Sequence, residues 1–195
     1  DGILEIVPNT PGGPLVVYKL KTDGGNAGKD DFFSAHTVFD GPQGHGLGCG
    51  DIAGNERMDF VLNNGWLEAP ENPYGMAWTW HPEFELFRSA SVPILVADVN
   101  GDGLSDIIAG GGHEFGLVWL EQVRNGDART WLRHTIDAEN SQYHDMQWVD
   151  IDGDGHCELV TGTRYRAHCG RDPGTDDLVG IYYFKWNGES FTKQV

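Results

Sequence analysis

Two short segments of the sequence place oxygen-bearing side chains at the spacing of a calcium-binding loop. In each segment they occupy positions 1, 3, 5 and 9, a glycine at position 6 permits a sharp turn, and position 7 can add its backbone carbonyl. Ca²⁺ takes about six to eight oxygen ligands, and alternate residues of a tight loop converge on one point. The predicted ligands are Asp98, Asn100, Asp102, the Leu104 carbonyl and Asp106 in one loop, and Asp150, Asp152, Asp154, the His156 carbonyl and Glu158 in the other. We therefore expect two Ca²⁺ sites; the alternative is a pair of solvated acidic turns.

A third segment, residues 51–59, keeps only part of this pattern. Ala53 stands at position 3 and Glu56 stands where the glycine belongs, although Asn55 and the last aspartate remain. Because the oxygen at position 3 is missing, we expect this loop to be free of metal and to be held by Arg57 instead.

Histidines, arginines and aromatic residues carry a second kind of chemistry. Neutral imidazoles bind transition metals or transfer protons near neutral pH. Arginine holds a carboxylate or polarises a sugar oxygen, and tryptophan and tyrosine pack on sugar rings. The candidates for metal ligation, proton transfer or substrate binding are His45, His144, His168, Tyr165, Arg164 and Arg166, and those for ligand contact are Trp78, Trp80, His81, His113 and Arg171. Each histidine alone also has a purely structural interpretation; the prediction rests on the group.

The loops recur because the chain repeats itself. The first aspartates of the three loops lie 47 and 52 residues apart, and residues 1–7 align with residues 154–160 as part of a fourth copy. Repeats of this length are typical of solenoids and propellers. The alignment divides the chain into units at about 1–44, 45–91, 92–143 and 144–195.

Each unit has the pattern of several short strands. Apolar runs at 94–97, 107–109, 117–120 and 131–136 are separated by turn residues. Four short strands per unit of about 50 residues predict the four-stranded antiparallel blade of an all-β propeller, with a β-helix as the alternative. Four blades alone would leave sheet edges open. We therefore expect further blades from the parent chain or from another copy.

A blade of this kind separates the two sets of candidate residues. If each acidic loop joins the first strand to the second, all loops lie on one face of the propeller. His45 and His144 each stand six residues before the first loop aspartate, which places them at the start of an innermost strand on the opposite face. His113 and His168 fall in connections between second and third strands, on that same face.

The loop motifs DxNxDGxxD and DxDxDGxxE resemble FG-GAP/VCBS repeats, the calcium-loop blades of integrin-type propellers and of many secreted proteins. The resemblance covers nearly the whole chain. It implies a propeller of about seven blades and a secreted or extracytoplasmic location, either periplasmic or at the cell surface. Residues 44–66, 89–107, 141–155 and 164–174 are also similar to the propeller domain of aldos-2-ulose dehydratase and its bacterial relatives. Those proteins eliminate water from keto-sugars with metal assistance.

Composition excludes several partners. The chain has 195 residues and a formal charge of −17, which argues against nucleic acid, because such a partner needs a basic surface. No apolar run approaches the roughly 20 residues of a membrane helix, so we expect no membrane insertion. Neither a GxSxG nucleophile motif nor a phosphate-binding loop is present in the sequence.

Two functions from different classes remain, with a structural spacer as a third. As an enzyme, the protein would be a carbon–oxygen lyase of the sugar dehydratase type, with Zn²⁺ or another divalent metal at the histidine face. As a binding module, it would present that face to a carbohydrate or keto-sugar ligand in the manner of a lectin, or to another protein.

Overall fold

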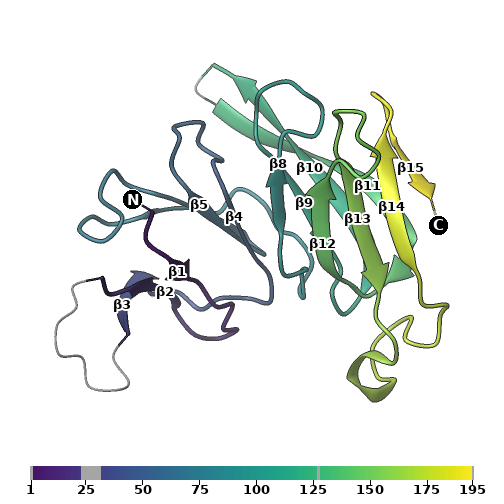
Figure 1. Cartoon of the computed structure of the whole chain (residues 1–195), viewed down its shortest axis with the longest axis horizontal. Helices are drawn as coiled ribbons and strands as arrows, with labels where there is room; N and C mark the ends of the chain where they lie inside the picture. Colours follow the sequence, from purple (N-terminus) through teal and green to yellow (C-terminus); the bar gives the residue numbers. More distant parts are fainter. Residues whose placement is uncertain (1, 23–31, 127, 195) are drawn as a thin grey trace.

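The computed structural model describes residues 2–22, 32–126 and 128–194, and these residues form four antiparallel sheets (Figure 1). Asp1, residues 23–31, Asp127 and Val195, which belong to the predicted units, lie outside the described residues. The strands of the first two sheets are β1 (Glu5–Ile6), β2 (Leu15–Leu20) and β3 (Phe33–Phe39), then β4 (Leu47–Gly50), β5 (Asp59–Leu62), β6 (Gly65–Glu68) and β7 (Thr79–His81). Those of the last two are β8 (Leu95–Ala97), β9 (Asp106–Gly110), β10 (Phe115–Asn125) and β11 (Ala128–Ser141), then β12 (Tyr143–Val149), β13 (Glu158–Thr163), β14 (Ile181–Trp186) and β15 (Phe191–Gln194).

The prediction of an all-β fold with antiparallel sheets is confirmed, and the β-helix alternative is wrong. Every sheet runs in chain order, from one strand to its neighbour. The described part of the chain contains no α-helix; it has one 3₁₀ turn, η1 (Ala167–Cys169). Within these ranges no helix has the length and apolar character needed to cross a membrane.

The first strands of the last three sheets lie side by side. β8 contacts both β4 and β12, and Gly48 of β4 forms a parallel bridge with Ile94 just before β8. A Cβ atom on Gly48 would lie 2.1 Å from the Ile94 carbonyl oxygen, and one on Gly110 would lie 2.4 Å from the Tyr143 carbonyl oxygen. Glycine is therefore required where neighbouring sheets meet, because any side chain would push the backbones apart.

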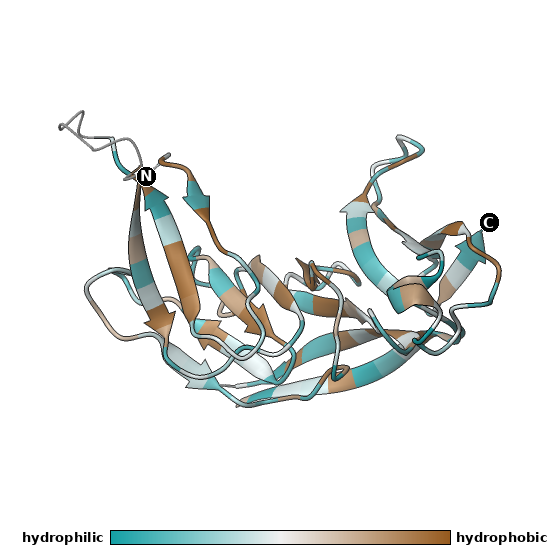
Figure 2. Ribbon diagram, turned by 90° about the horizontal axis from the view of Figure 1, so that it is seen from below, coloured by the Kyte–Doolittle hydropathy of each residue, from teal (hydrophilic) through white to brown (hydrophobic). Residues whose placement is uncertain are grey.

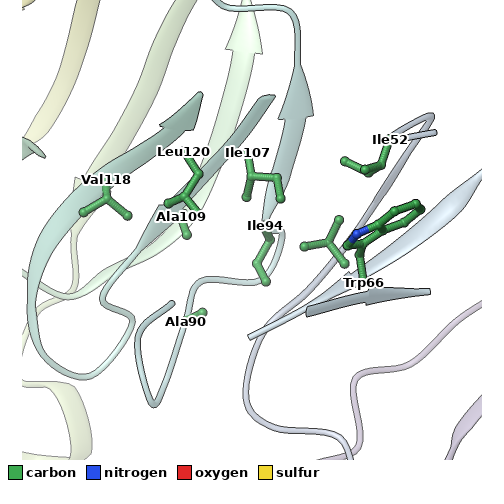
Figure 3. Close-up of a cluster of buried hydrophobic side chains, with 9 residues drawn as sticks. Ile52, Trp66, Ala90, Ile94, Ile107, Ala109, Val118 and Leu120 are labelled. Carbon is green, nitrogen blue, oxygen red and sulfur yellow. The ribbon is translucent and has the colours of Figure 1, made fainter. Parts of the chain in front are cut away.

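The core lies between successive sheets, and strand alternation divides side chains between its two sides. In β9, Ile107 and Ala109 pack toward the second sheet, while Ile108 packs toward the fourth. Successive side chains of a strand point to opposite faces, so a strand buried on both faces contributes to two clusters. Figure 3 shows the cluster between the second and third sheets, and Figure 2 shows hydrophobic and hydrophilic segments mixed along the strands. These clusters hold the ends of the strands, and hence both sets of candidate residues, in place.

The strand within the apolar run 94–97 is less buried than the residue types of the run suggest. The run 94–97 has the pattern of a strand buried on both faces, yet Leu95, Val96 and Ala97 are only half-buried, and the fully buried strand is β9. The physical reason is position: β8 is the edge strand of its sheet, whereas β9 lies between two strands.

Candidate functional site

Three histidines from three different segments meet at one end of the sheets. His45 precedes β4 and forms a parallel bridge with Ser89, His113 lies in the turn between β9 and β10, and His144 is the second residue of β12. The acidic loops follow β4, β8 and β12, so they leave the opposite ends of these strands. One ring nitrogen from each histidine lies within 4.8 Å of the others.

The distances within this cluster match those around a single metal ion. The Nε2 atoms of His45 and His113 are 3.2 Å apart. Two nitrogen ligands of a tetrahedral zinc ion, at Zn–N distances of about 2.0–2.1 Å, would be about 3.3 Å apart. The His144 ring centroid lies 5.0 Å from that of His45 and 5.5 Å from that of His113.

Hydrogen bonds on the far side of two rings set their tautomers. The Nδ1 atom of His45 lies 2.7 Å from the carbonyl oxygen of Ala90, which only accepts, so Nδ1 carries the proton. The Nδ1 atom of His113 lies 2.9 Å from Oδ2 of Asp172 and donates to that carboxylate. Both Nε2 atoms of the neutral rings therefore present lone pairs to each other. This orientation, with the second nitrogen held by a carbonyl or a carboxylate, is typical of metal-ligating histidine.

Arg164 closes the cluster on the side of Asp172. One terminal nitrogen of its guanidinium donates to the Gly112 carbonyl and to Oε1 of Gln142, both at 2.9 Å. These two bonds use both hydrogens of that nitrogen, which leaves the Nδ1 proton of His113 for Asp172. His168 and Asp172 form a second grouping with His113. The Arg164 nitrogen lies 3.1 Å from His113 Nδ1 and 3.5 Å from Asp172 Oδ2, so its charge already occupies that position. The geometry favours one metal position rather than two.

His168 reaches the cluster from the connection that follows β13. Its ring stacks on that of His113 with centroids 4.5 Å apart, and its Nδ1 lies 3.0 Å from Oδ1 of Asp172. The backbone of His168 has a φ of 47°, in the left-handed region, and so do the backbones of Arg166 and Cys169. Its side chain is 58% exposed, which makes it the solvent-facing histidine of the group.

Burial lowers the pKa of two of the three rings, those of His113 and His144. Burial, followed by the positive charge of Arg164 and by the neighbouring rings, lowers the pKa of His144 to about 4. Burial is also the main cause that lowers the pKa of His113, against the opposing effect of Asp172. For Asp172, burial opposes ionisation, but hydrogen bonds from His113 and His168 outweigh it and lower the pKa. Neutral imidazole is the form that binds a metal.

The structure brings only some of the predicted face residues together. His45, His113, His144, His168 and Arg164 meet. Tyr165, Arg166 and Arg171 are exposed, and among the described residues no contact joins them to the histidines. Trp78, Trp80 and His81, predicted to contact a ligand, instead pack against Phe60, Phe39 and Trp66, respectively. The long insertion folds onto its own sheet and the first one, instead of reaching the histidines.

Sequence reasoning missed two residues of the cluster. Asp172 lies four residues after His168, within the segment that contains the arginines, but nothing in its spacing marks it. Gln142 is fully buried beside Tyr143, with a φ of 65°, and its Nε2 donates to the Pro173 carbonyl. A polar residue next to a strand start is a weak signal, so only the folded contacts reveal it.

The three acidic loops share one backbone structure. The first aspartate of each accepts hydrogen bonds from backbone amides three and five residues later. The last carboxylate accepts from the amide at position 2, as Asp59, Asp106 and Glu158 each do. Arg57, expected to hold the first loop, donates instead to the Ala69 carbonyl at 2.8 Å, beside the loop. The loop fold therefore forms from its own amides and carboxylates.

Comparison with known proteins identifies one repeat family in part of the chain. The four antiparallel sheets define an all-β repeat protein. Residues 98–161 match the FG-GAP-like repeat, and this stretch contains both complete acidic loops as well as His113 and His144. Repeats of this kind are typical of extracellular proteins. A search of curated proteins found no match, and nothing supports the similarity to aldos-2-ulose dehydratase.

Proposed function

We propose that this chain is a calcium-stabilised part of a β-propeller that binds a divalent transition metal, with Zn²⁺ as the best fit, through His45, His113 and His144. The observation that carries the proposal is the approach of two Nε2 atoms to 3.2 Å while both Nδ1 protons are donated elsewhere. Two lone pairs at this distance repel each other unless a cation or a proton lies between them. Because burial lowers the pKa of His113 and His144, a metal ion is the better occupant at neutral pH.

We further propose that the site acts on or binds a carbohydrate or keto-sugar. A zinc ion held by three histidines supplies a Lewis acid with a position open to a ligand oxygen. His168, stacked on His113 and open to solvent, is placed to move a proton, and Asp172 orients both rings. This arrangement suits the carbon–oxygen lyase predicted above. Of the aromatic residues predicted to contact a sugar, Tyr165 is 75% exposed in the connection that also carries His168.

The alternative is a non-catalytic binding module, lectin-like or protein-binding. It is favoured by the engagement of Arg164, whose terminal nitrogen donates to Gly112 and Gln142 rather than facing a ligand. In either case we propose a secreted or extracytoplasmic location, in line with the FG-GAP-like repeat. We also propose a propeller whose further sheets come from the parent chain or from a second copy. Light scattering tests this, since a stable monomer of 21.5 kDa without partner would contradict it.

The metal proposal is tested by elemental analysis of protein purified without chelator or histidine tag, followed by zinc titration against a chromophoric chelator. We expect one tight transition-metal ion per chain, lost in His45→Ala and in His113→Ala. The matched controls are His36→Ala and His134→Ala, because these rings bind Ser34 and Glu121, away from the cluster. Equal zinc affinity in all five proteins would overturn the proposal.

The choice between lyase and binding module needs a separate measurement. Loss of water from keto-sugars produces a conjugated carbonyl, which ultraviolet absorbance detects. Turnover that requires zinc and falls in His168→Ala supports the lyase. Saturable sugar binding without turnover supports the binding module.

A further inference from the structure

One lysine reaches into the acidic loop at residues 150–158. Lys185, in β14, places its Nζ atom 2.8 Å from Oδ2 of Asp152, 2.6 Å from Oδ2 of Asp154 and 3.3 Å from Oε1 of Glu158. These three carboxylates are among the predicted calcium ligands of this loop. The ammonium group therefore contacts the same oxygens that a calcium ion would bind.

Glu158, at the buried end of the loop, has a carboxylate oxygen that a nearby positive charge would stabilise. Oε2 of Glu158 accepts a hydrogen bond from the Ile151 amide, whereas Oε1 is buried and has no hydrogen-bond partner. A buried carboxylate oxygen without a donor is costly unless a cation lies close to it. Carboxylate oxygens of Asp150, Asp152 and Glu158 also lie within 4.8 Å of one another. Lys185 supplies the compensating charge, and its ammonium group also donates hydrogen bonds to Asp152 and Asp154.

Beside the loop at residues 98–106, the position equivalent to Lys185 holds a negatively charged residue, Glu121. The register pairs Leu159 with Phe184 and Ile107 with Leu120, which puts Lys185 opposite Glu158 but Glu121 opposite Asp106.

Within that loop, the Asn100 amide donates to Oδ2 of Asp102 at 3.2 Å and to Oε1 of Glu121 at 3.3 Å. Among the described residues no lysine or arginine pairs with this loop. A neutral amide that turns to offer its oxygen is easier to accommodate beside Ca²⁺ than an ammonium ion.

We propose that Lys185 is the built-in cation of loop 150–158, so that Ca²⁺ fills loop 98–106 first and enters loop 150–158 only by displacing the lysine. This inference rests on the proposed calcium role of the loops. Calcium affinity in such loops follows the charge of the ligands. Loop 150–158 has four carboxylate ligands, and Lys185 lowers its net charge from −4 to −3, whereas loop 98–106 has three carboxylate ligands with Glu121 as a fourth negative charge beside them. The lysine side chain is 38% exposed, so it can leave the loop without disturbing the core.

The test is a calorimetric titration of chelator-treated protein with CaCl₂. Wild type should show two unequal sites, separated by about tenfold or more, the tighter one lost in Asp102→Ala. Lys185→Met should tighten the weaker site until the two affinities agree within about threefold. Lys185→Arg, which keeps the charge, should leave the sites unequal. Lys21→Met is the control for net charge, since it removes a lysine outside the loops.

The failures of the two proposals differ in this experiment. Two equal sites in wild type, unchanged by Lys185→Met, would overturn the role of Lys185 and leave calcium binding intact. Absence of calcium binding by wild type and by Lys185→Met at millimolar calcium would overturn the calcium role of the loops, and the inference with it. Lys185→Gln provides a second neutral variant should the methionine variant fold poorly.

Discussion

Polar groups are paired differently at the two ends of the sheets. At the loop end, carboxylates are matched by backbone amides and, at residues 150–158, by Lys185. At the histidine end, the Nδ1 protons of His45 and His113 are used and two lone pairs are left facing each other. The loop end thus pairs many of its carboxylate oxygens with donors of the chain itself, whereas the proposed metal at the histidine end would lie between two facing lone pairs. Calcium should therefore modulate stability, and the transition metal should define function.

The largest expected effect concerns calcium at loop 98–106. At a free concentration about a hundredfold above the dissociation constant, a ligand bound only by the folded state adds about 2.7 kcal/mol to the free energy of unfolding. For a chain of this size that corresponds to a rise in Tm of about 5–10 °C. Asp102→Ala should abolish this rise at its loop. Scanning calorimetry with and without chelator measures it, and Asn55→Ala, in the loop expected to be free of metal, is the control. An identical melting curve with and without chelator would mean that calcium does not stabilise the loop end.

The next largest effect concerns Asp172, a carboxylate at the histidine end that contacts His113 on the side away from the proposed metal. Asp172→Asn removes the charge that holds the Nδ1 proton of His113, and loss of such a partner typically weakens metal affinity by about 10–100-fold. Competition with a chromophoric chelator measures zinc affinity, and the Co²⁺ absorption spectrum reports a change in ligand geometry. Asp176→Asn, an exposed change in the same connection, should leave both unchanged. Equal losses in the two variants would mean that Asp172 has only a structural role.

The ion pair between the buried Asp137 and Lys193 should make stability depend on pH. It can be compared with the more exposed contacts of Lys185 with Asp152 and Asp154. Burial opposes ionisation of Asp137, but hydrogen bonds from Lys193, from the backbone and from Tyr143 lower its pKa to about 2. Because the folded-state pKa lies below the value of about 3.9 in an unfolded chain, this stabilisation is present above about pH 4 and is lost as the pH falls through 2.

Urea unfolding from pH 6 to pH 2 should show a loss of about 1–2 kcal/mol that is absent in Asp137→Asn. The matched pair Lys193→Met and Lys185→Met compares the two lysines at pH 7 without calcium. We expect Lys193→Met to cost more, because Lys193 bonds directly to the buried Asp137 carboxylate at 2.8 Å, whereas the more exposed Lys185 approaches the buried Glu158 oxygen only to 3.3 Å. A greater loss in Lys185→Met would reverse the comparison.

The sequence predicts the local elements better than the meeting of distant side chains. The short apolar runs and the repeated loops are enough to predict antiparallel strands, because both signals are local. His45 and His144 could be placed at strand starts from their fixed spacing to the loop aspartate. The role of Asp172 could not be predicted, because it depends on an irregular connection with left-handed backbone at Arg166 and His168. The packing of Trp78 and Trp80 could not be predicted, because an insertion carries no repeat that would fix its path.

The smallest effect lies in the loop that departs from the repeat. Glu56 has a φ of 64°, where Gly103 and Gly155 have 85° and 89°. A side chain in the left-handed region costs about 1 kcal/mol that glycine does not incur. Offset by the greater freedom of glycine in the unfolded chain, Glu56→Gly should stabilise the protein by about 0.5 kcal/mol. Glu56→Ala, which removes the charge but keeps the Cβ atom, should bring no such gain in urea unfolding. If both variants gain equally, the cost lies in the charged side chain of Glu56 rather than in its backbone conformation.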